Sequence, residues 1–251
     1  MALPAAVERF ATEGVLIAGG ARAILLQIAD PVVGAGVARH SDFANRPLDR
    51  LRNTLTFSYA VVLGTPEEAR LVAGHVDRAH AGIPGATDPA HQLWVAATLY
   101  DTAVRVHDLV FGPLDEQTAD NVLDAYSALG TALQVPRVDW PVDRAAFGGY
   151  WSANMAALEV GDDARRVAHD LFHPTTAPWW LRAALPLANL LTASLLDPPL
   201  REAYGMPWSV ARARRARAAW RVIRAVVRVL PPRLRRWPAR HTLARLRART
   251  T

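Results

Sequence analysis

The chain contains neither cysteine nor lysine among its 251 residues. Without cysteine, disulfide bonds, thiolate zinc sites, iron–sulfur clusters and cysteine nucleophiles are excluded, so a metal ion would have to be bound by histidine or carboxylate. Without lysine, a G-x-x-x-x-G-K-[ST] phosphate-binding loop cannot form. The G-x-S-x-G, H-E-x-x-H and EF-hand patterns are also missing. The sequence therefore gives no support to the common nucleotide-binding, hydrolase, zinc-protease and calcium-binding classes.

Long uncharged apolar runs are missing as well. Near the N-terminus, Glu8, Arg9 and Glu13 interrupt the region in which a secretory signal would carry its apolar core. The longest candidate, residues 183–196, contains Pro186 and is shorter than the roughly 20 residues that cross a bilayer. We expect neither a signal peptide nor a membrane span, and hence a cytoplasmic protein.

Apolar residues are nevertheless abundant: 51% of the chain is hydrophobic and only 21% is charged. This composition excludes a disordered or low-complexity protein and provides for a sizeable core. Single cores stop growing near roughly 250 to 300 residues. The length thus predicts one domain covering residues 1–251.

Charge is unevenly distributed along the chain. All 29 basic residues are arginine, and 14 of them lie in residues 208–251, where no acidic residue occurs. Residues 1–207 carry the other 15 arginines against 23 acidic residues. We expect residues 208–251 to form a basic helical extension that packs on the acidic body. Contact with anionic lipid or nucleic acid is the alternative.

Apolar residues recur at spacings of three and four, whereas alternating patterns are scarce, which predicts an all-α fold. The strongest local signal is Thr65 followed by Pro66, Glu67 and Glu68, which is typical of a helix start. Helices are expected at residues 13–29 with a break at Gly19-Gly20, 32–38, 48–63, 66–81, 89–111, 115–133 and 143–158, then in an apolar segment ending near 196 after a connection at 172–186, and at 209–230.

Histidine is the remaining source of metal ligands. His75 and His80 lie five positions apart, which places them about 140° apart around a helix axis, so they cannot readily share one metal. A single histidine can serve an iron that a macrocycle already holds, and His80 precedes a glycine-rich break. Taken alone, a histidine at a helix end is usually a capping or surface residue. Arg50 and Thr54, four apart on one face, are equally ordinary on pattern alone.

Several sequence blocks resemble one known family, in the same order and with the same spacing. The blocks are GGARAILLQIADP (19–31), GVARHS (36–41), DRLRNT (49–54), GTPEEA (64–69), HVDRAH (75–80), LWVAATL (93–99), LREAYGMPWS (200–209) and LPPRLR (230–235). Together they resemble the oxygenase MpaB and latex-clearing-protein (rubber oxygenase) family. The resemblance covers almost the whole chain.

The resemblance implies a helical domain that encloses a b-type haem and uses dioxygen on apolar substrates. By that resemblance His80 is the axial ligand of the haem iron, Arg50 and Thr54 line the distal side, and His40 is a further candidate that could relay a proton. The function implied is a haem b-dependent oxygenase that acts with dioxygen on a small apolar metabolite.

Three further residues are candidates for contact with the haem. Arg22 and Gln27 could bind its propionates or cap neighbouring helices, and Trp94 lies within one of the blocks. The other tryptophans are expected in the core, because aromatic residues at helical spacing mostly supply buried area.

The chain also departs from the family pattern. Asp30 stands where members often carry a histidine before proline, and Ala96 where many carry a histidine after Trp-Val. Asn53 replaces the lysine that rubber-cleaving relatives place next to the distal threonine. These changes could remodel the pocket, and rubber cleavage is not expected.

Two other functions stay open. One is a haem protein without oxygenase turnover, such as a peroxidase-like, sensing or haem-carrying protein. The other is a protein without haem whose arginine-rich helix at 209–230 binds an anionic membrane, which would place the chain at the inner membrane face. Nucleic-acid binding is not expected, because the basic helix carries an apolar stripe and no DNA-binding motif. The oligomeric state and the electron donor are left open.

Overall fold

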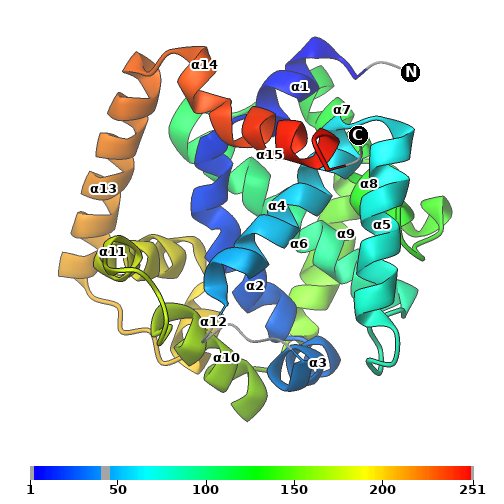
Figure 1. Ribbon diagram of the computed structural model, residues 1–251. Coiled ribbons are helices and arrows are strands. Elements are labelled where there is room, and N and C mark those ends of the chain that lie inside the picture. Colours follow the sequence, from blue (N-terminus) through cyan, green and yellow to red (C-terminus); the bar gives the residue numbers. More distant parts are fainter. Residues whose placement is uncertain (1–2, 41–45, 250–251) are drawn as a thin grey trace.

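The computed structural model describes residues 3–40 and 46–249, and every regular element within them is helical (Figure 1). The prediction of an all-α domain is thus confirmed. The first half comprises α1 (Ala5–Ala11), the 3-10 helix η1 (Gly14–Gly19), α2 (Gly20–Ile28), α3 (Pro31–His40), α4 (Pro47–Leu63), α5 (Pro66–His80) and α6 (Pro89–Phe111).

The second half continues with shorter helices and ends in a basic arm. It comprises α7 (Glu116–Tyr126), α8 (Ala128–Thr131), the 3-10 turn η2 (Arg137–Asp139), α9 (Arg144–Ala157), α10 (Asp162–Phe172), α11 (Trp179–Leu195), α12 (Pro198–Ala203), α13 (Val210–Val229), α14 (Pro232–Arg235) and α15 (Trp237–Arg247).

Side chains at the helix starts explain several of these boundaries. Thr65 and Glu68 form a capping box at α5: the Glu68 backbone N–H donates to Thr65 Oγ1 at 3.3 Å, and the Thr65 N–H donates to Glu68 Oε2 at 2.8 Å. Such a box satisfies two of the backbone donors that a helix start leaves unpaired. Asp88, Asp115 and Asp143 accept equivalent bonds at the starts of α6, α7 and α9.

Two sequence-based expectations about helices are wrong. The segment 115–133 is not one helix: α7 ends at Tyr126 and the short α8 begins at Ala128, and at the break between them the Ser127 hydroxyl donates to the Asp124 carbonyl at 2.6 Å. Residues 179–186 are not a connection but the first half of α11, which contains Pro186. Burial of Leu191 and Leu195 anchors the second half of this helix, so the single backbone bond that proline removes does not end it.

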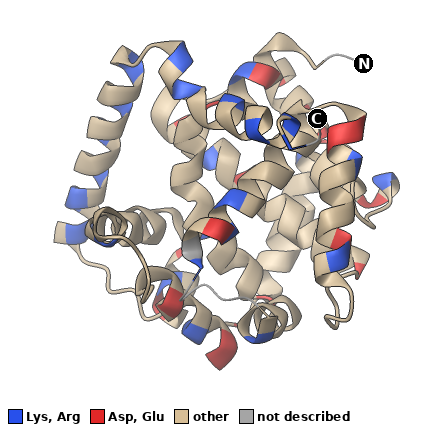
Figure 2. Cartoon of the chain, in the orientation of Figure 1, with Lys and Arg blue, Asp and Glu red and all other residues tan. Residues whose placement is uncertain are grey.

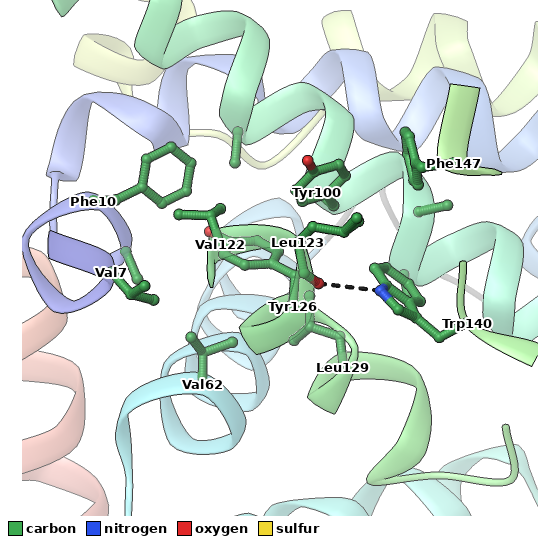
Figure 3. Packing of buried hydrophobic residues seen from close by; sticks show 14 of the residues in the cluster. Val7, Phe10, Val62, Tyr100, Val122, Leu123, Tyr126, Leu129, Trp140 and Phe147 are labelled. Atoms are coloured by element: carbon green, nitrogen blue, oxygen red, sulfur yellow. Dashed lines mark hydrogen bonds between the residues drawn. The ribbon is translucent and has the colours of Figure 1, made fainter. Parts of the chain in front are cut away.

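The central helix α6 separates two apolar clusters. One cluster packs α6 against α1, α7 and α9, with Tyr100, Tyr126, Trp140 and Phe147 at its centre (Figure 3). The Trp140 indole donates to the Leu123 carbonyl at 3.1 Å, so its polar atom is satisfied in the interior. The other cluster packs α2, α10 and α11 around Trp94. α6 therefore contributes residues to both clusters and connects them.

The C-terminal helices lie along the body (Figure 1). On α13, the Trp220 indole donates to the Ser194 hydroxyl at 3.0 Å, and Arg224 Nε donates to the Leu109 carbonyl at 3.1 Å. Farther along, Arg247 Nε lies 2.6 Å from a Glu68 carboxylate oxygen. Residues 208–249 thus contact α11, α6 and α5 through both apolar and charged groups.

Within residues 3–40 and 46–249, no single helix has the length and apolar composition of a membrane span. Only α1 taken together with residues 14–28, a pair bent by 49°, meets that description.

Candidate functional site

The first group of candidate residues lies on the helical hairpin of α4 and α5. The Gly64-Thr65 turn joins these two helices, and they pack against one another. Arg50 and Thr54 lie in the first half of α4, whereas His80 is the last residue of α5. Arg50 and His80 therefore lie at the end of the hairpin that is remote from the connecting turn, called the hairpin end, and Thr54 lies one helical turn farther in, near the middle of α4.

His80 is half-buried, and its Nδ1 atom is buried without a hydrogen-bond partner among the described residues. Burial lowers the pKa of His80; Asp77 opposes this shift, and the positive charge of Arg50 adds to it. The ring is therefore neutral at neutral pH. Neutral imidazole is the form that binds metals, because its unprotonated nitrogen carries a free lone pair.

Arg50 and Thr54 occupy an exposed stretch of α4. Desolvation at the guanidinium lowers the pKa of Arg50, although arginine stays cationic at neutral pH. The Thr54 hydroxyl donates to the Arg50 carbonyl at 3.1 Å, which leaves the lone pairs of its oxygen as acceptors. Because the charge of Arg50 acts on His80, the hairpin end combines a cation, a hydroxyl and a neutral imidazole.

His40 lies apart from the hairpin, as the last residue of α3, and it is exposed. It precedes residues 41–45, so Ser41 of the second sequence block lies outside the described residues. The turn after α5 approaches α3, since Gly36 faces Ile83 and Gly85 faces Val32. The structure thus brings α3 close to the chain that follows His80, while the proton-relay role of His40 stays a prediction.

Arg22 belongs to a second group, in the interior between α2, α6 and α11. Its side chain is 1% exposed. Its Nε donates to the Leu195 carbonyl at 2.9 Å, Nη1 donates to Thr102 Oγ1 at 2.7 Å, and Nη1 lies 2.6 Å from an Asp101 carboxylate oxygen. Its guanidinium carbon lies 5.7 Å from the Trp151 ring centroid. These contacts hold three helices together.

Gln27 and Trp94 connect α2 with α6 in the same way. Gln27 Nε2 donates to Thr98 Oγ1 at 3.0 Å, and the buried Trp94 indole donates to the Leu26 carbonyl at 3.1 Å. The structure therefore separates the predicted residues into a hairpin group and an interior group. Haem contact by Arg22, Gln27 and Trp94 stays a prediction.

Asp30, one of the departures from the family pattern, has two structural roles. Its Oδ1 accepts hydrogen bonds from the backbone N–H groups of Val32 and Val33 at 2.9 and 3.0 Å, which caps α3. Its Oδ2 lies 3.2 Å from His91 Nδ1, at the start of α6. The pairing with His91 could not be found from the sequence, because 61 positions separate the two residues and no spacing rule connects them.

Residues 3–40 and 46–249 contain no group of three or more His, Asp or Glu side chains arranged to hold a metal ion.

Comparison with known proteins places this chain in a family. The model of the family described as "ER-bound oxygenase mpaB/B'/Rubber oxygenase, catalytic domain" matches residues 7–229. The chain belongs to this family. The match runs from α1 to the last residue of α13, so α13 is part of the oxygenase-type catalytic domain, whereas α14 and α15 follow it. The resemblance of the sequence blocks is confirmed.

Two relatives from mycobacteria are similar over most of their length. The uncharacterized proteins Rv2237 of Mycobacterium tuberculosis and Mb2261 of Mycobacterium bovis are each 36% identical to the chain over 224 residues. The aligned segment covers 84% of this chain and 88% of each relative. No solved structure matches the chain.

Proposed function

We propose that this chain is a haem b-dependent oxygenase that acts with dioxygen on a small apolar metabolite, with His80 as the axial ligand of the haem iron. Membership of the oxygenase family supports the reaction class. The ligand assignment rests on two things together: His80 lies in the family block HVDRAH, and its buried Nδ1 has no hydrogen-bond partner among the described residues in a ring whose pKa is lowered. His107 shares the buried Nδ1 and the lowered pKa, but it lies outside the family blocks.

The residues present fit a haem. A macrocycle supplies four nitrogen ligands, so the protein has to add only one. Buried polar atoms are normally hydrogen-bonded, and an imidazole nitrogen without a partner, in a ring kept neutral by burial, is suited to a ligand from outside the chain. When bound, the haem supplies the binding and activation of dioxygen.

The hairpin residues contribute charge and hydrogen bonds. Arg50 supplies a permanent positive charge with several N–H donors, and such groups stabilise negative charge that develops during a reaction. Thr54 offers a hydroxyl oxygen on the same face of α4, since its own proton is donated to the helix backbone. His40 at the end of α3 is the proposed group that takes or relays a proton from the substrate.

The interior group serves the same site as a supporting wall. The polar atoms of Arg22, Gln27 and Trp94 bond to protein partners on α2, α6 and α11. We propose that this wall bounds the haem and the apolar substrate, because small-molecule sites are lined mainly by apolar side chains with a few polar groups. Asp30 and Ala96, where other members often carry histidine, would adapt the pocket to a different substrate.

Haem titration monitored by absorption spectroscopy tests the ligand. We expect the wild-type chain to bind one haem with an intense Soret band, and the His80→Ala variant to lose the band or shift it strongly. His75→Ala is the matched control, because His75 is an exposed histidine five positions earlier on the same helix. A wild-type chain that binds no haem, or a His80→Ala variant with the wild-type spectrum, would contradict the proposal.

Oxygen consumption separates an oxygenase from a haem carrier. With haem bound, we expect dioxygen uptake in the presence of an apolar substrate and a fall of about 10²-fold to 10³-fold in the rate for Arg50→Gln, the range typical of losing one charge-stabilising donor. Haem binding that is not accompanied by any uptake over a panel of apolar substrates would favour a carrier or sensor.

A further inference from the structure

Helix α13 has two apolar faces, and only one of them packs on the body. Ala216, Trp220 and Val227 are buried on the inner face. On the opposite face, Val222, Val226 and Val229 are 62%, 47% and 81% exposed to solvent. Their spacing of four and three residues places these valines in one strip along the helix. This outer strip, defined as Val222, Val226 and Val229, points away from the protein.

A row of arginines runs beside the outer strip. Arg214, Arg221 and Arg228 follow one another at intervals of seven residues and are exposed, and a seven-residue interval drifts by only about 20° around a helix. None of the three forms an ion pair or a hydrogen bond with the described part of the chain, whereas Arg212 bonds to the body through Asn189 at 3.0 Å. This arginine row therefore presents unneutralised charge to the surroundings.

No acidic residue balances this surface from within the arm. Residues 208–251 contain none, and Figure 2 shows basic segments without acidic ones on α13, α14 and α15. Beyond α13, an open hollow of about 630 Å³ lies along α14 and α15. It is lined by arginines together with Leu234 and Trp237, which are 59% and 57% exposed. The combination of cationic and apolar groups thus continues past the end of the helix.

We propose that the outer face of α13 binds the surface of an anionic lipid bilayer, with the outer strip at the acyl boundary and the arginine row against lipid phosphates. An exposed helix with apolar residues beside arginines has the pattern of an interfacial membrane helix. Pairing of two copies through this face is opposed by repulsion between the arginine rows. A nucleic-acid backbone would attract the arginines but leave the valines exposed. Lipid is the partner that accommodates both features.

Vesicle flotation tests the proposal on the full chain. We expect binding to vesicles that contain roughly a third phosphatidylserine, none to pure phosphatidylcholine, and a steep decrease as salt rises, because surface charge interactions are screened. The variant Arg214→Gln, Arg221→Gln, Arg228→Gln should bind at least tenfold more weakly. Its control changes the same charge elsewhere, through Arg9→Gln, Arg70→Gln and Arg166→Gln, all of which are exposed on the body.

The valines need a control of their own. We expect Val222→Ser with Val229→Ser to weaken vesicle binding severalfold, whereas Val138→Ser with Val142→Ser, at sites that are 89% and 86% exposed, should have no effect. Equal binding to neutral and anionic vesicles, or full binding by the arginine variant, would overturn the proposal. So would an unchanged affinity of the valine variant, or tighter binding to a DNA duplex than to anionic vesicles, because either result indicates a purely electrostatic partner. Thermal unfolding monitors the fold of each variant.

Discussion

The two groups of polar residues in this molecule differ in how their atoms are satisfied. In the interior group, the guanidinium of Arg22 contacts a carbonyl, a hydroxyl and a carboxylate, and Trp94 donates to a carbonyl. At the hairpin end, Arg50 and Thr54 are exposed, the Thr54 hydroxyl donates only to the local Arg50 carbonyl, and a buried nitrogen of His80 has no hydrogen-bond partner among the described residues.

This difference distinguishes polar residues that stabilise the core from polar residues that are candidates for a reaction. Satisfied polar networks fix the arrangement of a core, and the interior group joins α2, α6 and α11 in this way. Places where local rules are relaxed are expected at functional sites. The comparison therefore leads us to expect that substitutions in the interior group change stability most, whereas substitutions at the hairpin end change the proposed activity.

Replacing Arg22 should have the largest effect. In Arg22→Met, the Asp101 carboxylate loses its ion-pair partner, and the Leu195 carbonyl keeps only the longer bond from Arg105 Nη1 at 3.3 Å. Removing one member of a buried pair destabilises by about 3 to 5 kcal/mol, and denaturant unfolding measures the change. Arg70→Met, at an exposed ion pair with Glu67, should change stability by less than about 1 kcal/mol. Equal effects of the two substitutions would break the division.

Two adjacent glycines, Gly19 and Gly20, test how tightly the chain packs beside the interior group. A Cβ on Gly19 would lie 2.9 Å from Val106 Cγ2 and closer still to Thr102, whereas a Cβ on Gly20 would meet nothing within 4 Å. We expect Gly19→Ala to destabilise the chain by about 1 to 3 kcal/mol through overpacking. Gly20→Ala should stabilise it by roughly 0.4 to 1 kcal/mol, since Gly20 already has helical dihedral angles. Thermal unfolding of both variants would reveal any reversal of this order.

The cap on α3 should contribute a smaller amount to the free energy of unfolding. Asp30→Ala removes the acceptor of two backbone N–H groups, which destabilises by about 1 kcal/mol. Asp30→Asn keeps an oxygen for the cap and loses the charge beside His91, so it should retain most of the stability. Denaturant unfolding measures both variants, and a loss for Asp30→Asn as large as for Asp30→Ala would assign the effect to the charge.

The smallest expected effect is a pH dependence at the hairpin end. Because the pKa of His80 in the folded chain is below its ordinary value of 6.5, the unfolded chain binds the proton more readily. Wild-type stability should therefore fall as the pH drops from 7 through 6.5 towards the folded pKa, and His80→Gln should lack this component. His75→Gln is the control and should retain it. Unfolding curves between pH 7 and pH 5 that keep the same difference between wild type and His80→Gln would contradict this assignment.

Local sequence signals predicted much of the fold. The start of α5 at Thr65 and Pro66 follows from short-range chemistry, and so does the break at Gly19-Gly20, where η1 gives way to α2. The prediction of a connection ending at Pro186 was wrong, because burial of the second half of α11 outweighs the one backbone hydrogen bond that proline removes. The split at Ser127, where the backbone dihedral angles remain helical, has no signal in the helical periodicity.

The candidate site was less accessible from the sequence. Four-residue spacing is sufficient to place Arg50 and Thr54 on one face of α4, and the family blocks select His80. The three-helix contacts of Arg22 depend on partners 80 and 173 positions away, so no local pattern could distinguish this structural arginine from Arg50. The outer strip of α13 was also hidden, because its valines and the buried stripe share one helix.

The most direct test of the account is the unfolding free energy of wild type and His80→Ala, each measured with and without haem. Without haem, the two chains should differ by less than about 1 kcal/mol, as expected away from packed cores. At free haem equal to a hundred times the dissociation constant of the wild type, the wild type should gain about 2.7 kcal/mol, and His80→Ala should gain little. An equal gain in both chains, or no gain in either, would contradict the assignment of His80 as the haem ligand.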